Sequence, residues 1–167
     1  MANDGPLRVT VEWEKAVPFD TSKRAHLYTM RDATYALYML LEREAGSSSA
    51  ELMYIGIVKS AYRDLYQRMT EHQKDWIGRL MASGSAVTVK FGHLWTTGEA
   101  TSRLLEDVES ALVFGRNPPE NTAKMKSYTL YEDVIVTNRG AGKYLARTYD
   151  TALQRKTGGT GIPQRKS

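Results

Sequence analysis

Five side chains that can exchange protons or bind ions occur in otherwise apolar or amphipathic segments of the chain. Tyr38 lies in the run TYALYMLLE, and Tyr54 lies in the run ELMYIGIV, directly before Ile-Gly. Arg68 and His72 are four residues apart, so a helix would present both on one face. Glu109 falls on the border of a helical apolar stripe, where a carboxylate is costly unless it is paired or bound to a metal ion.

Each of these residues also has an ordinary structural explanation. The two tyrosines suit a β-hairpin, the arginine and histidine suit a helix surface, and the glutamate could form an ion pair with a nearby arginine. Their order along the chain is more informative than any one of them. Tyrosine, tyrosine, arginine, histidine and glutamate are followed by an asparagine in the segment NPPEN.

Hydrophobic periodicity predicts the elements that carry these residues. Alternating apolar residues indicate strands, and an apolar stripe at helical spacing indicates a helix. Ser60 is the expected N-cap of the first helix, and Thr97 or Thr101 that of the second. The predicted elements are strands within residues 6–17, 34–42, 52–58 and 86–96, helices over 60–82 and 97–116, and two short strands within 131–150.

This order predicts an α+β fold with a small, mostly antiparallel three-stranded core sheet flanked by helices, in the order β-β-α-β-α. An N-terminal strand and a C-terminal β-hairpin would extend the core. Residues 1–150 would form one domain. Residues 151–167 contain four basic residues, several glycines and no acid, which predicts a basic, flexible tail that is solvated or touches nucleic-acid phosphates.

Composition narrows the function classes. The chain has 167 residues and a formal net charge of +4, a weak indication of a phosphate-bearing partner. It has no cysteine, which excludes disulfides and thiolate metal sites within it. No apolar run approaches the roughly 20 residues that span a bilayer, and MANDGPLRVT lacks the apolar core of a signal peptide. We therefore expect a cytoplasmic protein that does not enter a membrane.

The ordered set of polar residues resembles the GIY-YIG nuclease family, in particular its restriction-type and phage-type members. Tyr54-Ile55-Gly56 matches the second half-motif, whereas Ala36-Leu37-Tyr38 keeps only the tyrosine of the first. The segment RMTEH carries the arginine and histidine at the spacing of restriction-type members. The resemblance covers roughly residues 33–122, and the positions that match in LEDVESALVFGRNPPEN are Glu109, Leu112, Val113, Pro119 and Asn121.

Three departures from the family pattern stand out. Ala36 replaces the first glycine, and the loop between the two tyrosines is longer than in compact members. The interval from Tyr54 to Arg68 is also long, so Arg63 is a rival for the catalytic arginine. Arg68 is preferred because His72 follows it at the expected offset.

The resemblance implies a metal-dependent endonuclease that hydrolyses phosphodiester bonds in DNA. Glu109 would be the ligand of a single Mg²⁺ or Mn²⁺ ion, since a hard ion can keep several waters beside one carboxylate. Arg68 would neutralise a phosphate oxygen. Tyr38 would be the base and pass its proton to a neutral His72, and Tyr54 would hydrogen-bond the phosphate or the attacking water.

Lys59, Arg63 and Asn121 complete the expected nucleic-acid-binding set, Asn121 by fixing local geometry rather than by chemistry. The alternative function is a catalytically inactive nucleic-acid-binding module of the same fold. A structural or interaction domain would instead leave these side chains scattered in space. RNA is not excluded as the substrate, and specificity could come from the terminal segments, the loops, a homodimer or a larger complex. Restriction, mobile-element mobility, repair and phage defence all remain open as roles.

Overall fold

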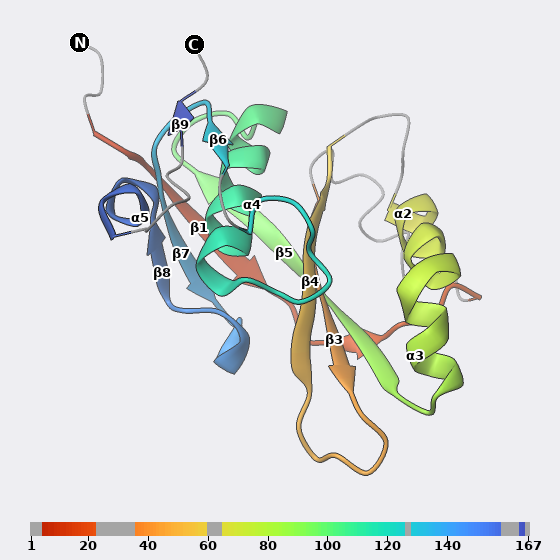
Figure 1. The fold of residues 1–167 in the computed structure, drawn as a ribbon. Helices are drawn as coiled ribbons and strands as arrows, with labels where there is room; N and C mark the ends of the chain where they lie inside the picture. Colours follow the sequence, from red (N-terminus) through yellow and green to blue (C-terminus); the bar gives the residue numbers. More distant parts are fainter. Residues whose placement is uncertain (1–4, 23–35, 60–64, 126–127, 158–163, 166–167) are drawn as a thin grey trace.

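A curled seven-stranded sheet organises the chain in the computed structural model, which describes residues 5–22, 36–59, 65–125, 128–157 and 164–165 (Figure 1). The strands run in the order β4-β3-β5-β1-β7-β8, and β2 pairs with β5 beside this path. In a second sheet β6 pairs with β9. The strands are β1 (Leu7–Trp13), β2 (Val17–Pro18), β3 (Ala36–Arg43), β4 (Glu51–Val58), β5 (Ala86–Thr96), β6 (Thr129–Leu130), β7 (Val134–Arg139), β8 (Thr148–Asp150) and β9 (Gln164–Arg165).

The prediction of a small three-stranded core sheet is wrong, because the N-terminal strand and the C-terminal hairpin belong to the same sheet as the hairpin that bears the tyrosines. Strand β5 pairs with β3 through its first part and with β1 through its second part, and Gly92 is in register with both Leu37 and Trp13. Strand β1 then pairs in parallel with β7, where Val11 lies opposite Asn138. The predicted extensions are therefore internal to one continuous sheet.

The two faces of the sheet carry separate cores, and alternation along β3 divides its residues between them. Leu37 and Met39 pack against α4 (Ser102–Arg116) on one face. Tyr38 and Leu40 face the opposite way, into a core with residues of α2 (Leu65–His72) and of the turn that follows it. Figure 1 shows α4 and α2 on opposite sides of the β3–β4 hairpin. This period of two places the Tyr38 phenol beside the first helix and away from α4.

The predicted helix over 60–82 is interrupted. Residues 60–64, which include the expected cap Ser60 and the rival arginine Arg63, lie outside the described residues. Helix α2 continues into a π-helical turn, Gln73–Ile77, and then into α3 (Gly78–Ala82). Asp75 has the non-helical angles φ −91 and ψ −109, so the backbone departs from regular helix one turn after His72.

Helix α4 begins later than predicted. The hydroxyl oxygen of Thr101 accepts a hydrogen bond from the Leu104 amide at 3.1 Å, which identifies Thr101 and not Thr97 as the N-cap. The helix ends where Asn117 takes the left-handed conformation, with φ 56, directly before two prolines. The start and the end of the helix bearing Glu109 are thus explained by local sequence.

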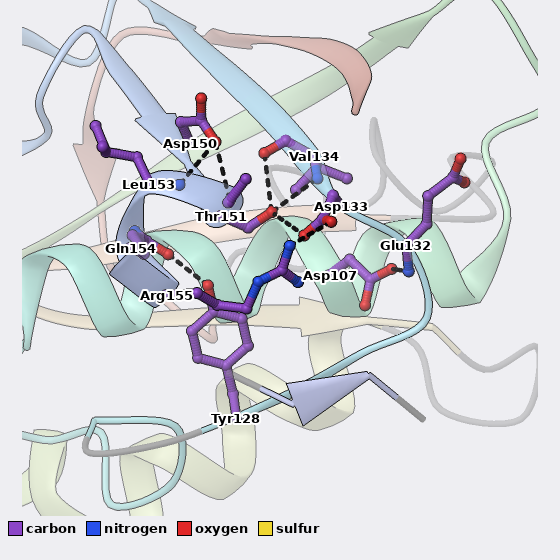
Figure 2. A network of polar contacts seen from close by, with 11 residues as sticks. Asp107, Tyr128, Glu132, Asp133, Val134, Asp150, Thr151, Leu153, Gln154 and Arg155 are labelled. Atoms are coloured by element: carbon purple, nitrogen blue, oxygen red, sulfur yellow. Dashed lines mark hydrogen bonds and ion pairs between the residues drawn. The ribbon is translucent and has the colours of Figure 1, made fainter. Parts of the chain in front are cut away.

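Part of the predicted flexible tail is a packed element, because residues 151–157 form helix α5 (Thr151–Thr157). Thr151 is 0% exposed and accepts a hydrogen bond from the Val134 amide at 2.9 Å, while Arg155 forms an ion pair with Asp133 (Figure 2). The Gln154 amide nitrogen donates to the Ala111 carbonyl of α4 at 3.0 Å. These contacts tie α5 to both β7 and α4, which the glycines and basic residues of the segment did not indicate.

Candidate active site

The two tyrosines lie side by side over a glycine of β4. In the β3–β4 pair, Tyr38 lies opposite Gly56 and Leu40 lies opposite Tyr54. The two phenol rings are stacked with centroids 6.1 Å apart. A Cβ atom added to Gly56 would lie 2.5 Å from the Tyr38 hydroxyl and 2.6 Å from Cε1 of Tyr54. The glycine of the Tyr-Ile-Gly word therefore leaves the space that both rings occupy.

Arg68 bridges the two phenols from helix α2. Its Nε donates to the Tyr38 hydroxyl at 3.2 Å, and its Nη2 donates to the Tyr54 hydroxyl at 2.9 Å. Its Nη1 donates to Glu71 at 2.9 Å, which holds the guanidinium from the solvent side. The guanidinium is planar and its donors point in different directions, so it can make all three hydrogen bonds from a single position.

His72 completes this cluster one helical turn after Arg68. Its Nε2 lies 2.9 Å from the Tyr38 hydroxyl. That hydroxyl accepts from Arg68 and has one proton of its own to donate, so the His72 tautomer with its proton on Nδ1 can accept the phenol proton at Nε2. The ring is 6% exposed and makes edge contacts with Tyr54, at a centroid distance of 4.6 Å, and with Trp76 at 6.0 Å.

Burial dominates the electrostatics of Tyr38. The phenol is 0% exposed, and desolvation raises its pKa well above the ordinary value, with a further increase from Tyr54. The charge of Arg68 lowers the pKa of Tyr38 but does not outweigh burial. Tyr38 is therefore a neutral phenol near pH 7, and it can act as a base only if its own proton leaves as another arrives.

Glu109 lies on α4, across the sheet from α2, and does not belong to the hydrogen-bonded cluster formed by the tyrosines, Arg68 and His72 within the described part of the chain. Its carboxylate pairs with Lys124, whose Nζ lies 2.5 Å from Oε2. The charge of Glu109 still reaches Tyr38, where it contributes to the raised pKa. The expected ion-pair partner of this glutamate was an arginine, and the structure supplies a lysine instead.

The available side chains fit a magnesium ion that is held by a single carboxylate. Among the residues that the structure describes, no group of three or more His, Cys, Asp or Glu side chains could hold a metal. Mg²⁺ is commonly bound by one or two carboxylates while it keeps several waters, so Glu109 alone is a chemically sufficient protein ligand. The Lys124 ammonium shares that carboxylate, and it was not anticipated from the sequence.

Asn121 fixes the strand that bears Tyr54. Its Nδ2 donates to the Ile55 carbonyl at 2.8 Å, and its Oδ1 accepts from the Ile55 amide at 2.9 Å. Strand β4 is at the edge of the sheet, so this side chain takes the backbone hydrogen bonds that a neighbouring strand would otherwise make. Asn121 is 6% exposed and thus positions the Tyr-Ile-Gly word from inside the protein.

The remaining predicted phosphate contacts are less closely tied to the cluster. Lys59 follows β4, has a side chain 49% exposed and pairs with Glu106 of α4. Arg63 lies outside the described residues, so only Arg68 can be placed beside the tyrosines.

Glu71 and Lys124 were both missed by the sequence reasoning. Glu71 falls inside the quoted word RMTEH, three residues after Arg68, and this spacing could have identified it as a partner.

No protein-family model matches this chain, and neither a curated protein nor a solved structure matches it. Across the described ranges, no helix is both long enough and apolar enough to cross a membrane.

Proposed function

We propose that this chain is a metal-dependent endonuclease of the GIY-YIG type that hydrolyses phosphodiester bonds in DNA. The observation that carries the proposal is the cluster in which Arg68 donates to both phenols while Tyr38 is hydrogen-bonded to His72. A purely structural role would not require a guanidinium, an imidazole and two phenols to converge from a hairpin and a helix. DNA is the proposed substrate because the order of these residues resembles that of a DNA-cleaving family.

The phosphate would be bound by the partly exposed side of the cluster. The Arg68 side chain is 26% exposed, and Tyr54 is half-buried, so an incoming phosphate can reach both. A guanidinium can donate to phosphate oxygens through two parallel bonds, and the Tyr54 hydroxyl can donate a third. Glu71 would be displaced in part as the phosphate takes its place on Arg68.

The proton of the attacking water would leave through Tyr38 and His72. The Tyr38 oxygen accepts one hydrogen bond from Arg68, which leaves a second lone pair for a proton from water. As that proton arrives, the phenol proton passes to Nε2 of His72 over the existing 2.9 Å hydrogen bond. Tyr38 is fully buried, so a neighbouring side chain must move aside before water reaches it.

Glu109 would hold the divalent ion. When bound, such an ion supplies Lewis-acid stabilisation of the phosphate oxygens and of the leaving oxygen. Glu109 is 13% exposed at its side chain and its charge is balanced by Lys124, so a divalent cation would bind there as the lysine moves away. The substituted first half-motif and the Lys124 ion pair instead favour the alternative, a module that binds nucleic acid without cutting it.

Cleavage of supercoiled plasmid with Mg²⁺ tests the proposal. We expect nicked or linear product with the natural chain and none with Glu109→Gln or Arg68→Gln. Glu51→Gln is the matched control, since Glu51 also pairs with a lysine, Lys143 at 3.2 Å, but is exposed and outside the cluster. Circular dichroism and thermal melting establish that each variant folds.

Equal cleavage by the natural chain and Glu109→Gln would remove Glu109 from the site. Binding of DNA without cleavage under Mg²⁺ or Mn²⁺ would instead establish the non-cutting alternative. A parallel arm with RNA of the same sequence decides which nucleic acid is the substrate.

A further inference from the structure

Lys124 is brought to Glu109 by a tightly constrained segment. Helix α4 ends at Asn117, Asn121 then attaches the chain to β4, and three residues later Lys124 returns to α4. Lys124 has φ 66, in the left-handed region that residues other than glycine rarely adopt. The backbone conformation therefore directs this side chain, and it ends with Nζ 2.5 Å from the carboxylate.

The ammonium and a divalent cation would compete for one carboxylate. Glu109 is 13% exposed and Lys124 is 27% exposed at their side chains, so the ion pair is partly shielded from water. A divalent ion on the same carboxylate would repel the lysine, because both carry positive charge. The repulsion is stronger than in bulk water, because the dielectric screening at this partly buried site is weaker. Lys124 must consequently leave Glu109, at least in part, when the ion binds.

A phosphate is the natural new partner for the released ammonium. Lysine is a compact cation on a flexible stem and binds phosphate as a point charge. A phosphate oxygen bound to an ion on Glu109 would lie within the reach that the Lys124 stem already spans. The phosphate would replace the Glu109 carboxylate as the negatively charged partner of Lys124.

Resting on the proposed function, we propose that Lys124 is a phosphate-binding residue which, before the metal ion binds, is held by Glu109. In this arrangement the lysine weakens metal binding until a nucleic-acid phosphate is present, and the glutamate weakens phosphate binding until a metal ion is present. Because coupling between two binding sites is reciprocal, the factor is the same in both directions. Coupling of this kind typically changes an affinity by about 5- to 150-fold.

The metal half of the proposal is tested without DNA. Binding of Mn²⁺ is followed by the electron paramagnetic resonance signal of the free ion, for the natural chain and for Lys124→Gln. We expect Lys124→Gln to bind Mn²⁺ at least about 5-fold more tightly, because the carboxylate no longer has a competing cation. Lys143→Gln, which breaks the exposed pair with Glu51, is the control and should leave Mn²⁺ binding unchanged.

The phosphate half is tested without metal, by fluorescence anisotropy of a labelled DNA duplex in EDTA. Glu109→Gln frees Lys124, so it should bind the duplex more tightly than the natural chain and steepen the salt dependence of log K by about 0.9. The double variant Glu109→Gln with Lys124→Gln should lose this gain. Glu109→Gln with Lys143→Gln should keep it, which separates a specific contact from a general change in net charge.

The outcomes distinguish this inference from the proposed function. Unchanged Mn²⁺ affinity in Lys124→Gln, or a duplex affinity that the double variant retains, overturns the role of Lys124 even if the natural chain cuts plasmid. No Mn²⁺ binding and no cleavage by the natural chain overturns the proposed function and this inference with it. Tighter Mn²⁺ binding by Lys124→Gln, together with a duplex affinity that rises in Glu109→Gln and falls back in the double variant, establishes Lys124 as the coupling residue.

Discussion

Replacing Gly56 with alanine tests whether the glycine is required by the two phenols. An added Cβ would lie 2.5 Å from the Tyr38 hydroxyl, 2.6 Å from Cε1 of Tyr54 and 2.7 Å from Cζ of Tyr38. Tyr38 is fully buried and held by hydrogen bonds to Arg68 and His72, so its ring cannot swing away into solvent. The strain must instead be relieved by a shift of the phenols or of the strands.

The expected cost follows from these contacts. Overpacking a close-packed core typically costs about 1–3 kcal/mol. Alanine in place of glycine in a strand recovers roughly 0.5–1 kcal/mol through the smaller entropy of the unfolded chain. With the middle of each range, we expect a net loss of about 1.3 kcal/mol in the free energy of unfolding, or about 3–5 °C in Tm for a chain of this size.

Activity should fall more than stability. Moving the Tyr38 hydroxyl far enough to accept the new methyl group disrupts its 2.9 Å hydrogen bond to His72. A misplacement of about 1 Å in a catalytic group can reduce a rate by roughly 100-fold, so plasmid nicking by Gly56→Ala should decrease by about that factor.

Thermal melting and plasmid nicking are measured together, with Gly98→Ala as the control because no atom lies within 4 Å of a Cβ added there. A Gly56→Ala protein that melts and cuts like Gly98→Ala would refute the packing argument.

Three further substitutions, with Thr97→Ala as a control, probe the supporting structure through urea unfolding. Asn121→Ala should cost about 1–3 kcal/mol, because it leaves the amide and carbonyl of Ile55 without their partner; an unchanged midpoint would contradict this role. Thr101→Ala should cost about 1 kcal/mol, while Thr97→Ala should cost nothing measurable. Burial raises the pKa of Asp107 from 3.8 to about 6, so the folded state binds the additional proton. The stabilisation that this proton gives is complete below pH 3.8 and is lost as the pH rises to about 6, so Asp107→Asn should flatten stability over that interval.

The parts of the site that depend on local periodicity were predictable from the sequence. The spacing of four put Arg68 and His72 on one helix face, and both reach Tyr38. The alternation in residues 86–96 predicted strand β5 at its observed bounds. The Tyr-Ile-Gly word was identified from the sequence as a motif, and the structure explains its glycine, because the two phenol rings occupy the space of a side chain at Gly56.

The parts that depend on long-range pairing were not predictable. Periodicity identifies β1 as a strand but does not say which strands flank it, and its position between β5 and β7 changes a three-stranded sheet into one of seven. Helix α5 is held in place by contacts of Thr151 and Arg155 with Asp133 and Val134. These contacts depend on tertiary structure, which the composition of the segment does not reveal. The pairing of Lys124 with Glu109 likewise depends on the path of the chain after Asn121.

The central place of β1 has a consequence for how the protein acquires its structure. Strand β1 leaves the ribosome before both of its neighbours in the finished sheet, β5 and β7, and β7 is made more than 120 residues after it. Until residues 134–139 have emerged, one edge of β1 lacks its parallel neighbour. Pairings at such long sequence separation are slow to form, so folding during synthesis should stall at a state with an open edge and finish only after residues 134–139 have emerged.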